Sequence, residues 1–404
     1  GLYQNLKELR DTEGRSSCNF FRSLGLDYLY VGEGNDIPSL VAAFAKVKDT
    51  SRPTVVHIHT QKGKGYAPAE ADREEFHWEM PFDLETGKPK VDCSGMEDYH
   101  SLTGKFLLEK MKEDHTVVAI SSGTPTVIGF TPERRKQAGR QFVDVGIAEE
   151  HAVALASGIA AGGGRPVYGV YSTFIQRCYD QLSQDLCING NPAVITVFMG
   201  TVAGMNDVTH LGFFDIPLIS NIPNMVYLAP TCSEEYFAML EWAVRQTEYP
   251  VAIRVPGVAV VHRKEEFDTD YSELNRYKMT ARGETVAILA LGSFYDLGQA
   301  LKNKLREESG VEATLINPRY ITGLDELMLE ELKVGHRIVV TLEDGVLDGG
   351  FGEKIARYYG NSEMRVLNYG LRKEFADRYN LDELMKANRL TDKQMAEDIA
   401  GILE

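Results

Sequence analysis

Apolar runs of strand length alternate with amphipathic helical stretches through the middle of the chain. Between residues 99 and 256 the pattern predicts strands at 116–122, 141–146, 166–172, 192–200, 224–230 and 250–256, and helices at 101–114, 149–163, 177–190 and 233–246. Regular alternation of this kind is typical of a mostly parallel sheet covered by helices on both faces. The sequence therefore predicts a doubly wound α/β domain, to which we assign residues 95–268.

A second α/β pattern occupies the C-terminal part of the chain. Strands are expected at 285–293, 312–319 and 336–345, with one helix at 298–308 and another after the glycine-rich turn LDGGFG at 347–352. A smaller α/β domain is expected over residues 269–404.

The first 65 residues carry only one strand–helix repeat. A helix is expected at 38–49 and a buried strand at 53–60, followed by a loop with two glycines. Because one repeat cannot bury its own apolar face, residues 1–65 are interpreted as the tail of a larger domain or as a piece completed by another chain. Residues 66–94, with prolines and no sustained period, are interpreted as a linker.

Composition and charge narrow the function classes. The 404 residues are 43% hydrophobic and 25% charged, which indicates a soluble globular protein. No apolar run approaches the length of a membrane span, and the first residues do not form a secretory signal, so a cytoplasmic protein is expected. The net charge of −16 argues against nucleic-acid binding.

The cysteines are scattered and carry no metal-ligand spacing. We expect them to be reduced and mostly buried, and we expect no metal ligands within this chain. They are Cys18, Cys93, Cys178, Cys187 and Cys232.

The most informative segment runs from Asp144 to Gln181, with Glu149 where a strand ends and a helix begins. In a doubly wound sheet this edge is the crevice where ligands bind. A single glutamate at a helix N-terminus is usually only a partner of the helix dipole, so the position alone does not assign chemistry.

Longer strings in and around this segment point to one family. The chain resembles the thiamine diphosphate enzymes of the transketolase superfamily, most closely the 1-deoxy-D-xylulose-5-phosphate synthase branch. The matching strings are KGKGYAPAEAD, DVGIAEEHAVALASGIAAGG, YSTFIQRCYDQ and THLGFFD. The resemblance implies a pyrimidine-binding domain, a C-terminal domain and, before them, the tail of a diphosphate-binding domain.

The resemblance also implies roles for individual residues. Glu149 matches the glutamate that hydrogen-bonds the pyrimidine ring of the cofactor and stabilises the tautomer needed for activation. Phe174 matches the aromatic residue that stacks on that ring, and Tyr171 and Arg177 match residues lining the same pocket. His210 matches a histidine that faces the substrate and transfers protons.

The chain departs from the family where the family binds its phosphorylated acceptor. Met199 and Gly257 stand where the family has phosphate-binding arginines, and neither side chain can replace an arginine fork. Asn35 stands where the family has an active-site histidine. We therefore expect an altered acceptor, bound by residues that include Asn35, Asn206, Asp207 and Arg254.

The family holds magnesium and the diphosphate through a GDG-containing motif, and this sequence contains no GDG. The resemblance implies decarboxylation of pyruvate and transfer of a two-carbon unit to an aldehyde, with thiamine diphosphate and Mg²⁺ as cofactors. The expected assembly is a homodimer, or a heteromer with a GDG-carrying subunit.

Two alternatives remain open. The chain could be the C-terminal subunit or fragment of a transketolase that transfers a ketol unit from a ketose. It could also be a non-catalytic interaction module that retains the fold.

Overall fold

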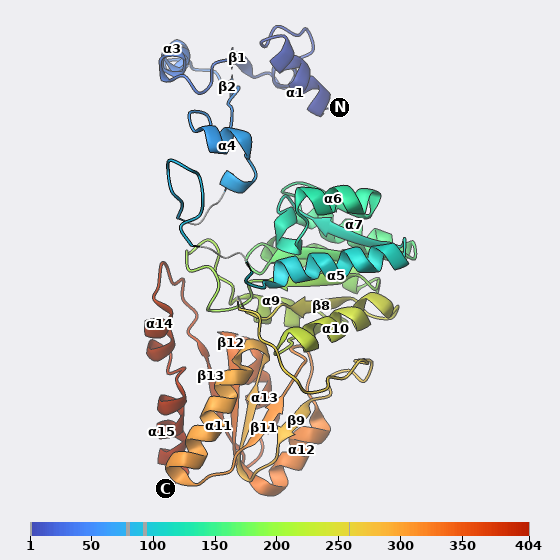
Figure 1. Ribbon diagram of the computed structural model, residues 1–404, viewed down its shortest axis with the longest axis vertical. Helices are drawn as coiled ribbons and strands as arrows, with labels where there is room; N and C mark the ends of the chain where they lie inside the picture. Colours follow the sequence, from blue (N-terminus) through green and yellow to red (C-terminus); the bar gives the residue numbers. More distant parts are fainter. Residues whose placement is uncertain (1, 78–80, 92–94, 258, 404) are drawn as a thin grey trace. The chain divides into compact units, whose positions relative to one another are not determined.

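The computed structural model describes residues 2–77, 81–91, 95–257 and 259–403. The chain forms two compact units, Gly1–Met96 and Glu97–Glu404 (Figure 1). In the described part of the chain, no helix combines the length and the apolar character needed to cross a membrane.

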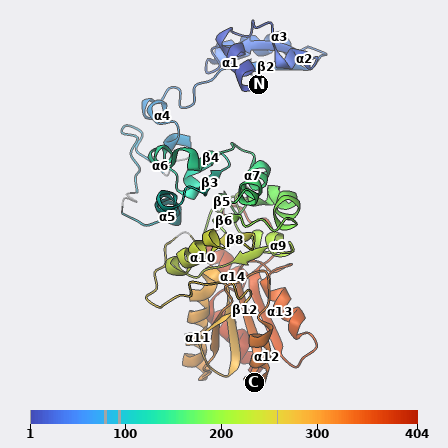
Figure 2. The same cartoon turned by 90° about the vertical axis from the view of Figure 1, so that its right-hand side faces the viewer.

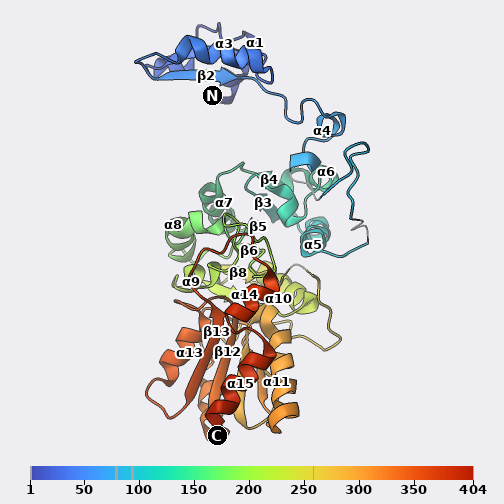
Figure 3. The same cartoon turned by 90° about the vertical axis from the view of Figure 1, so that its left-hand side faces the viewer.

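The first unit is built around two short parallel strands, β1 and β2, which pair from Asp27 with Thr54 to Val31 with Ile58. Helix α3 packs along this pair (Figure 3). Its elements are α1 (Leu2–Asp11), α2 (Phe20–Ser23), β1 (Asp27–Val31), α3 (Ile37–Val47), β2 (Thr54–Ile58), α4 (Ala67–Ala71) and a 3₁₀ turn at Glu75–His77.

The prediction of a buried strand in this unit is wrong in one respect. The residues of β2 are only half-buried, and Ile58 is exposed, because the strand has a single neighbour in its sheet. The predicted helix exists as α3, but it leaves Ile37, Val41 and Phe44 exposed by 71%, 63% and 54%. The unit therefore keeps an uncovered apolar helix face.

Residues predicted as a linker include ordered structure. Tyr66, Phe76 and Phe82 pack together with ring centroids 5.4–5.9 Å apart, and Phe82 forms an isolated bridge with Pro89.

The second unit begins with a six-stranded, fully parallel sheet of order β4-β3-β5-β6-β8-β7. Helices α5 and α10 lie on one face and α7 and α9 on the other (Figure 2), which confirms the doubly wound fold. The strands are β3 (Val117–Ser121), β4 (Phe142–Asp144), β5 (Arg165–Tyr171), β6 (Val194–Phe198), β7 (Val226–Leu228) and β8 (Val251–Arg254). The helices are α5 (Tyr99–Glu113), α6 (Pro132–Ala138), α7 (Glu149–Ala161), α8 (Tyr179–Gln181), α9 (Asp215–Ser220) and α10 (Ser233–Arg245).

The second sheet has five strands in the order β13-β12-β10-β11-β9, and all pairings are parallel except that of β9 with β11. The strands are β9 (Lys278–Ala281), β10 (Thr285–Ala290), β11 (Thr314–Asn317), β12 (His336–Val346) and β13 (Arg365–Leu371). The helices are α11 (Tyr295–Ser309), α12 (Glu326–Gly335), α13 (Phe351–Tyr359), α14 (Leu381–Ala387) and α15 (Asp392–Leu403).

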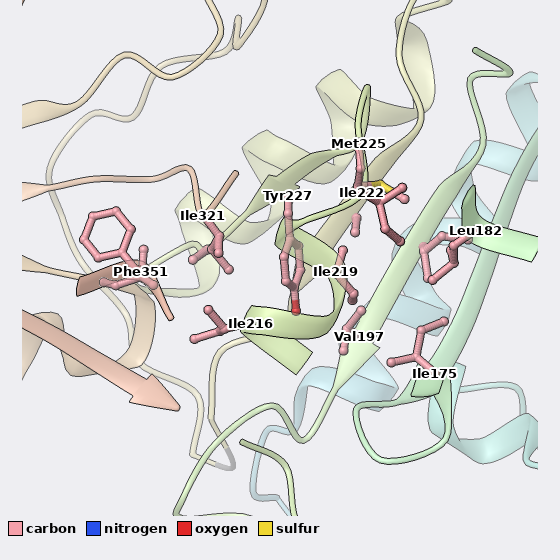
Figure 4. Close-up of a cluster of buried hydrophobic side chains, with 14 of the residues drawn as sticks. Ile175, Leu182, Val197, Ile216, Ile219, Ile222, Met225, Tyr227, Ile321 and Phe351 are labelled. Atoms are coloured by element: carbon pink, nitrogen blue, oxygen red, sulfur yellow. The ribbon is translucent and has the colours of Figure 1, made fainter. Parts of the chain in front are cut away.

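The two sheets share one apolar core. Figure 4 shows Ile216 and Tyr227 of the first sheet region facing Ile321 and Phe351 of the second. Since burial of such side chains is the main stabilising term in folding, the two sheets form one compact unit. The predicted boundary at residues 268 and 269 falls in the segment between β8 and β9 and stays a prediction.

The cysteine predictions can be checked for four positions. Cys178, Cys187 and Cys232 are buried and free, whereas Cys18 is free and exposed. Burial raises the pKa of the Cys178 and Cys187 thiols to about 12, so both stay protonated at neutral pH. Cys93 lies outside the described residues.

Candidate active site

Glu149 is the first residue of α7 and is buried. It follows a short connection from β4, so its carboxyl group lies at the carboxyl edge of the parallel sheet, next to the positive end of a helix dipole. Its Oε1 atom accepts a hydrogen bond from Nη1 of Arg177 at 2.7 Å. A buried carboxylate needs such a partner, because loss of water is otherwise uncompensated.

Two aromatic side chains at the end of β5, those of Tyr171 and Phe174, form what we call the aromatic wall. Tyr171 ends that strand, and its ring lies 5.8 Å from the ring of Phe174 at an angle of 64°. The guanidinium carbon of Arg177 lies 5.3 Å from the centre of the Phe174 ring. Arg177 therefore spans from the face of Phe174 to the carboxylate of Glu149, while 46% of its side chain stays exposed.

His210 reaches the same place from the long loop between β6 and α9. Its ring lies 5.4 Å from the ring of Phe174 in an edge-on arrangement. Its Nδ1 atom lies 3.0 Å from Oδ1 of Asp207 and 2.8 Å from Oγ1 of Thr209. The hydroxyl of Thr173 donates to the carbonyl of Thr209 at 3.1 Å and ties the loop to the aromatic wall.

Five residues selected from the sequence are thus joined by contacts at one edge of the sheet. They are Glu149, Tyr171, Phe174, Arg177 and His210. The arrangement offers a dry carboxylate, an aromatic face and a partly exposed imidazole, which is a set able to hold a flat nitrogen heterocycle and to move protons beside it.

These residues fit the aminopyrimidine end of thiamine diphosphate. The carboxylate is buried, its partner Arg177 is half-exposed, and Phe174 offers a half-buried ring beside it. Among the described residues there is no group of three or more His, Cys, Asp or Glu side chains that could hold a metal ion.

Two of the residues predicted to bind substrate lie in the His210 loop. Asp207 orients the imidazole, and hydrogen bonds from Thr209 and His210 hold the pKa of Asp207 below its usual range. The side-chain amide of Asn206 donates to the carbonyl of Tyr379 at 3.1 Å. Substrate binding by either residue stays a prediction.

Arg254, also predicted to bind substrate, has its side chain buried among protein groups. Its side chain is only 4% exposed, and its Nε atom donates to Oδ2 of Asp215 at 2.8 Å. Its Nη2 atom donates to the carbonyls of Gly212 at 3.2 Å and Asp344 at 2.5 Å. The structure places Arg254 as a buried cation between Asp215 and two backbone carbonyls, and its contact with substrate stays a prediction.

Asn35 lies in the first unit, where it bridges two loops. Its Oδ1 atom accepts from the backbone N–H of Gln61 at 2.6 Å, and its Nδ2 atom donates to the Gln61 carbonyl at 3.4 Å. Its predicted contact with substrate stays a prediction.

His100 was not selected from the sequence, although its ring packs against Tyr171 of the site. Its ring stacks on Phe198 with centroids 4.8 Å apart and meets the edge of Tyr171 at 6.3 Å. Its Nδ1 atom hydrogen-bonds the carbonyl of Val127 at 2.7 Å, and burial lowers its pKa. A lone histidine next to a predicted helix carries no signal of such a contact.

Comparison with protein families supports the interpretation of the two sheets. Residues 97–260 match the transketolase pyrimidine binding domain, and residues 276–395 match the transketolase C-terminal domain.

Several similar curated proteins are named 1-deoxy-D-xylulose-5-phosphate synthase. The protein of Clostridium tetani is 33% identical over 408 residues, covering 100% of this chain and 65% of the relative. That of Clostridium acetobutylicum is 34% identical, covering 95% and 60%, and that of Alkaliphilus oremlandii is 35% identical, covering 94% and 60%. The chain therefore spans 60–65% of the length of these relatives.

Two solved structures share the fold. One is a split-gene transketolase described as an inactive β4 tetramer, with a TM-score of 0.63, 21% identity, and coverage of 76% of this chain and 98% of that one. The other is a transketolase from Pichia stipitis, with a TM-score of 0.60, 14% identity, and coverage of 94% and 67%. The resemblance drawn from the motifs is confirmed, and this chain, which carries the pyrimidine-binding and C-terminal domains in order, belongs to the transketolase family.

Proposed function

We propose that this chain supplies the pyrimidine-activating side of a thiamine diphosphate active site, with Glu149 as the activating residue. The observation that carries the proposal is a buried carboxylate at a sheet edge, paired with a half-exposed Arg177 beside the ring of Phe174. Bound thiamine diphosphate would supply a nucleophilic carbon able to break and form bonds next to a carbonyl group.

Glu149 would hold a proton at the pyrimidine ring nitrogen. Burial strengthens this hydrogen bond because the surrounding dielectric is low. Arg177 donates to one oxygen of this carboxylate in the structure, so a bound ring would share Glu149 with the guanidinium or displace it. Phe174 would support one face of the ring and exclude water.

His210 would move a proton at the reacting oxygen of the substrate. With Nδ1 facing Asp207 and Thr209, its Nε2 atom is the nitrogen available for this transfer. Asp207 would fix the ring orientation, as an orienting carboxylate does for a general acid or base.

The names of the similar proteins favour a synthase of the 1-deoxy-D-xylulose-5-phosphate type, which joins a two-carbon unit from pyruvate to an aldehyde. Met199 and Gly257, in place of the family's arginines, support an altered acceptor with weak or absent use of glyceraldehyde 3-phosphate.

The diphosphate and its Mg²⁺ require ligands from elsewhere. The exposed row of Ile37, Val41 and Phe44 on α3 supports burial of the first unit against further polypeptide. We infer a homodimer, or a heteromer with a GDG-carrying subunit, in the cytoplasm.

A transketolase subunit is the second candidate, because nearly the whole of a split-gene transketolase chain superposes on this one. That protein is described as an inactive β4 tetramer, and on this candidate the present chain alone would be inactive too. The two candidates differ in their donor, since the synthase would use a keto acid and the transketolase subunit would use a ketose.

The test is turnover by the assembled protein, with the GDG-carrying part included, given thiamine diphosphate and Mg²⁺. We expect product from pyruvate with unphosphorylated aldehydes, and about 100-fold less with Glu149→Gln, in line with the size of acid–base effects. Glu150→Gln is the matched control, since this neighbour is exposed. Unchanged turnover in Glu149→Gln would refute the assignment, and rapid use of glyceraldehyde 3-phosphate would refute the altered acceptor.

A further inference from the structure

The loop that carries His210 has no regular structure of its own. It runs from residue 199 to residue 214, between the end of β6 and the start of α9, and contains only turns and bends. A proton-transferring side chain on such a loop needs outside support, because small displacements from the reacting atoms cost large factors in rate. Thr173 supplies one contact to this loop, at the carbonyl of Thr209.

A second set of contacts comes from the C-terminal sheet region. The segment 377–379, between β13 and α14, makes four hydrogen bonds to the His210 loop. The carboxylate of Asp377 accepts from the backbone N–H of Val208 at 3.1 Å, and the backbone N–H of Arg378 donates to the carbonyl of Asn206 at 2.6 Å.

The remaining two bonds involve Tyr379. Its hydroxyl donates to the carbonyl of Val202 at 2.7 Å, and its carbonyl accepts from the side-chain amide of Asn206 at 3.1 Å. Burial, together with the charge of Asp344, raises the pKa of Tyr379 to about 12, so the hydroxyl remains a donor at neutral pH.

The backbone of this segment also fits a holding role. Arg378 has a φ of 47°, in the left-handed region that side chains other than glycine rarely adopt. Such a conformation persists where surrounding contacts determine it, and the bond from Arg378 to Asn206 is one of them. Nearby, the ring of Phe375 lies 5.7 Å from that of Phe214, at the far end of the His210 loop.

We propose that Asp377 and Tyr379 are positioning residues, through which the C-terminal sheet region sets the place of His210. The catalytic meaning of this inference rests on the proposed function. Val208, bonded to Asp377, lies two residues from His210, whereas Glu149 and Phe174 stand on other elements. Loss of the Asp377 bond should therefore displace the histidine without disturbing the pyrimidine pocket.

The kinetic test uses the assembled protein. Asp377→Ala should lower kcat about tenfold and leave the affinity for thiamine diphosphate within about twofold, since one misplaced group affects the reacting state more than binding. Asp377→Asn should keep most of the activity, because the amide oxygen can accept the same bond from Val208. Tyr379→Phe, which removes only the bond to Val202, should give a smaller loss of kcat.

Asp382→Ala is the matched control, because this exposed aspartate lies in the first turn of α14, only five positions further along the chain. Unchanged kcat in Asp377→Ala would overturn the proposal. Equal damage from Asp377→Asn and Asp377→Ala would also overturn it, since charge and not hydrogen-bond geometry would then matter.

A second measurement separates this inference from the proposed function. Hydrogen–deuterium exchange on the full chain needs no turnover, and the Val208 amide should exchange about tenfold faster in Asp377→Ala than in Asp377→Asn or Asp382→Ala. Absence of turnover in the wild type would refute the proposed function alone. Unchanged exchange at residues 202–210 would refute the positioning role whatever the activity.

Discussion

Glu149 and Asp215 are a matched pair of carboxylates at the same parallel sheet. Each is the first residue of a helix, each is buried, and each is paired with an arginine. The difference lies in the arginines, since the side chain of Arg177 is 46% exposed and that of Arg254 only 4%.

The surroundings of the two arginines extend this contrast. Arg254 also donates to two backbone carbonyls, and Asp215 also accepts from the hydroxyl of Tyr227. Arg177 pairs with Glu149 and otherwise lies over the face of Phe174. One carboxylate is therefore locked into the fold, while the other has a half-exposed partner, as the proposed binding of the cofactor ring at Glu149 requires.

Removal of the locked arginine should have the largest effect on stability. Arg254→Met would leave the carboxylate of Asp215 buried without its cation, which typically costs about 3–5 kcal/mol. Urea unfolding of the mutant and wild type would measure this loss. A cost below about 1 kcal/mol would show that Asp215 is not locked as described.

Glu343 is a third buried carboxylate, and its hydrogen-bond partners are backbone N–H groups instead of an arginine. Glu343 accepts from the backbone N–H groups of Phe351 at 2.7 Å and Gly352 at 2.8 Å, and burial raises its pKa to about 7. Because the folded state holds this proton more tightly than the unfolded state, stability should fall as pH rises from about 4.5 to 7. The loss would approach about 3 kcal/mol.

Glu343→Gln should remove that pH dependence. Unfolding free energies of both proteins, measured at several pH values between 4.5 and 7, give the difference in slope. Parallel slopes would contradict a raised pKa for Glu343.

The smallest loss of stability is expected from removal of the ion pair between Arg177 and Glu149. Arg177→Met should cost about 1 kcal/mol, because the half-exposed Arg177 lies between Glu149 and solvent, and its removal lets water solvate the carboxylate in place of the lost partner. Thermal unfolding would measure it, with Arg165→Met as a comparison arginine whose guanidinium donates to the carbonyls of Val244 and Arg245. A loss as large as that of Arg254→Met would remove the distinction between the two carboxylates.

The fold was largely predictable because it depends on local patterns. Apolar strands and amphipathic helices predicted the six-stranded sheet, and the segment from Asp144 to Gln181 contains four of the five residues that meet at its edge. The antiparallel strand β9 and the irregular turn of α8 into a π-helix at Leu182–Cys187 were missed, because these depend on neighbours in space. The predicted helix at 177–190 is thus three short helical pieces.

Parts of the site could not be predicted for a similar reason. The burial of Arg254 depends on Asp215 and Asp344, which lie 39 and 90 positions away. The contact of Asp377 with Val208 joins residues 169 positions apart. Resemblance to a family assigns residue types to roles, but these pairings are set by packing of the two sheets.

The central claim is that Glu149 activates the cofactor through its pyrimidine ring. The most direct measurement is the rate of deuterium exchange at the thiazolium C2 proton of thiamine diphosphate, followed by NMR after mixing with the assembled protein. We predict fast exchange with the wild type and exchange about 100-fold slower with Glu149→Gln at saturating cofactor. Equal exchange rates with the two proteins would contradict the account.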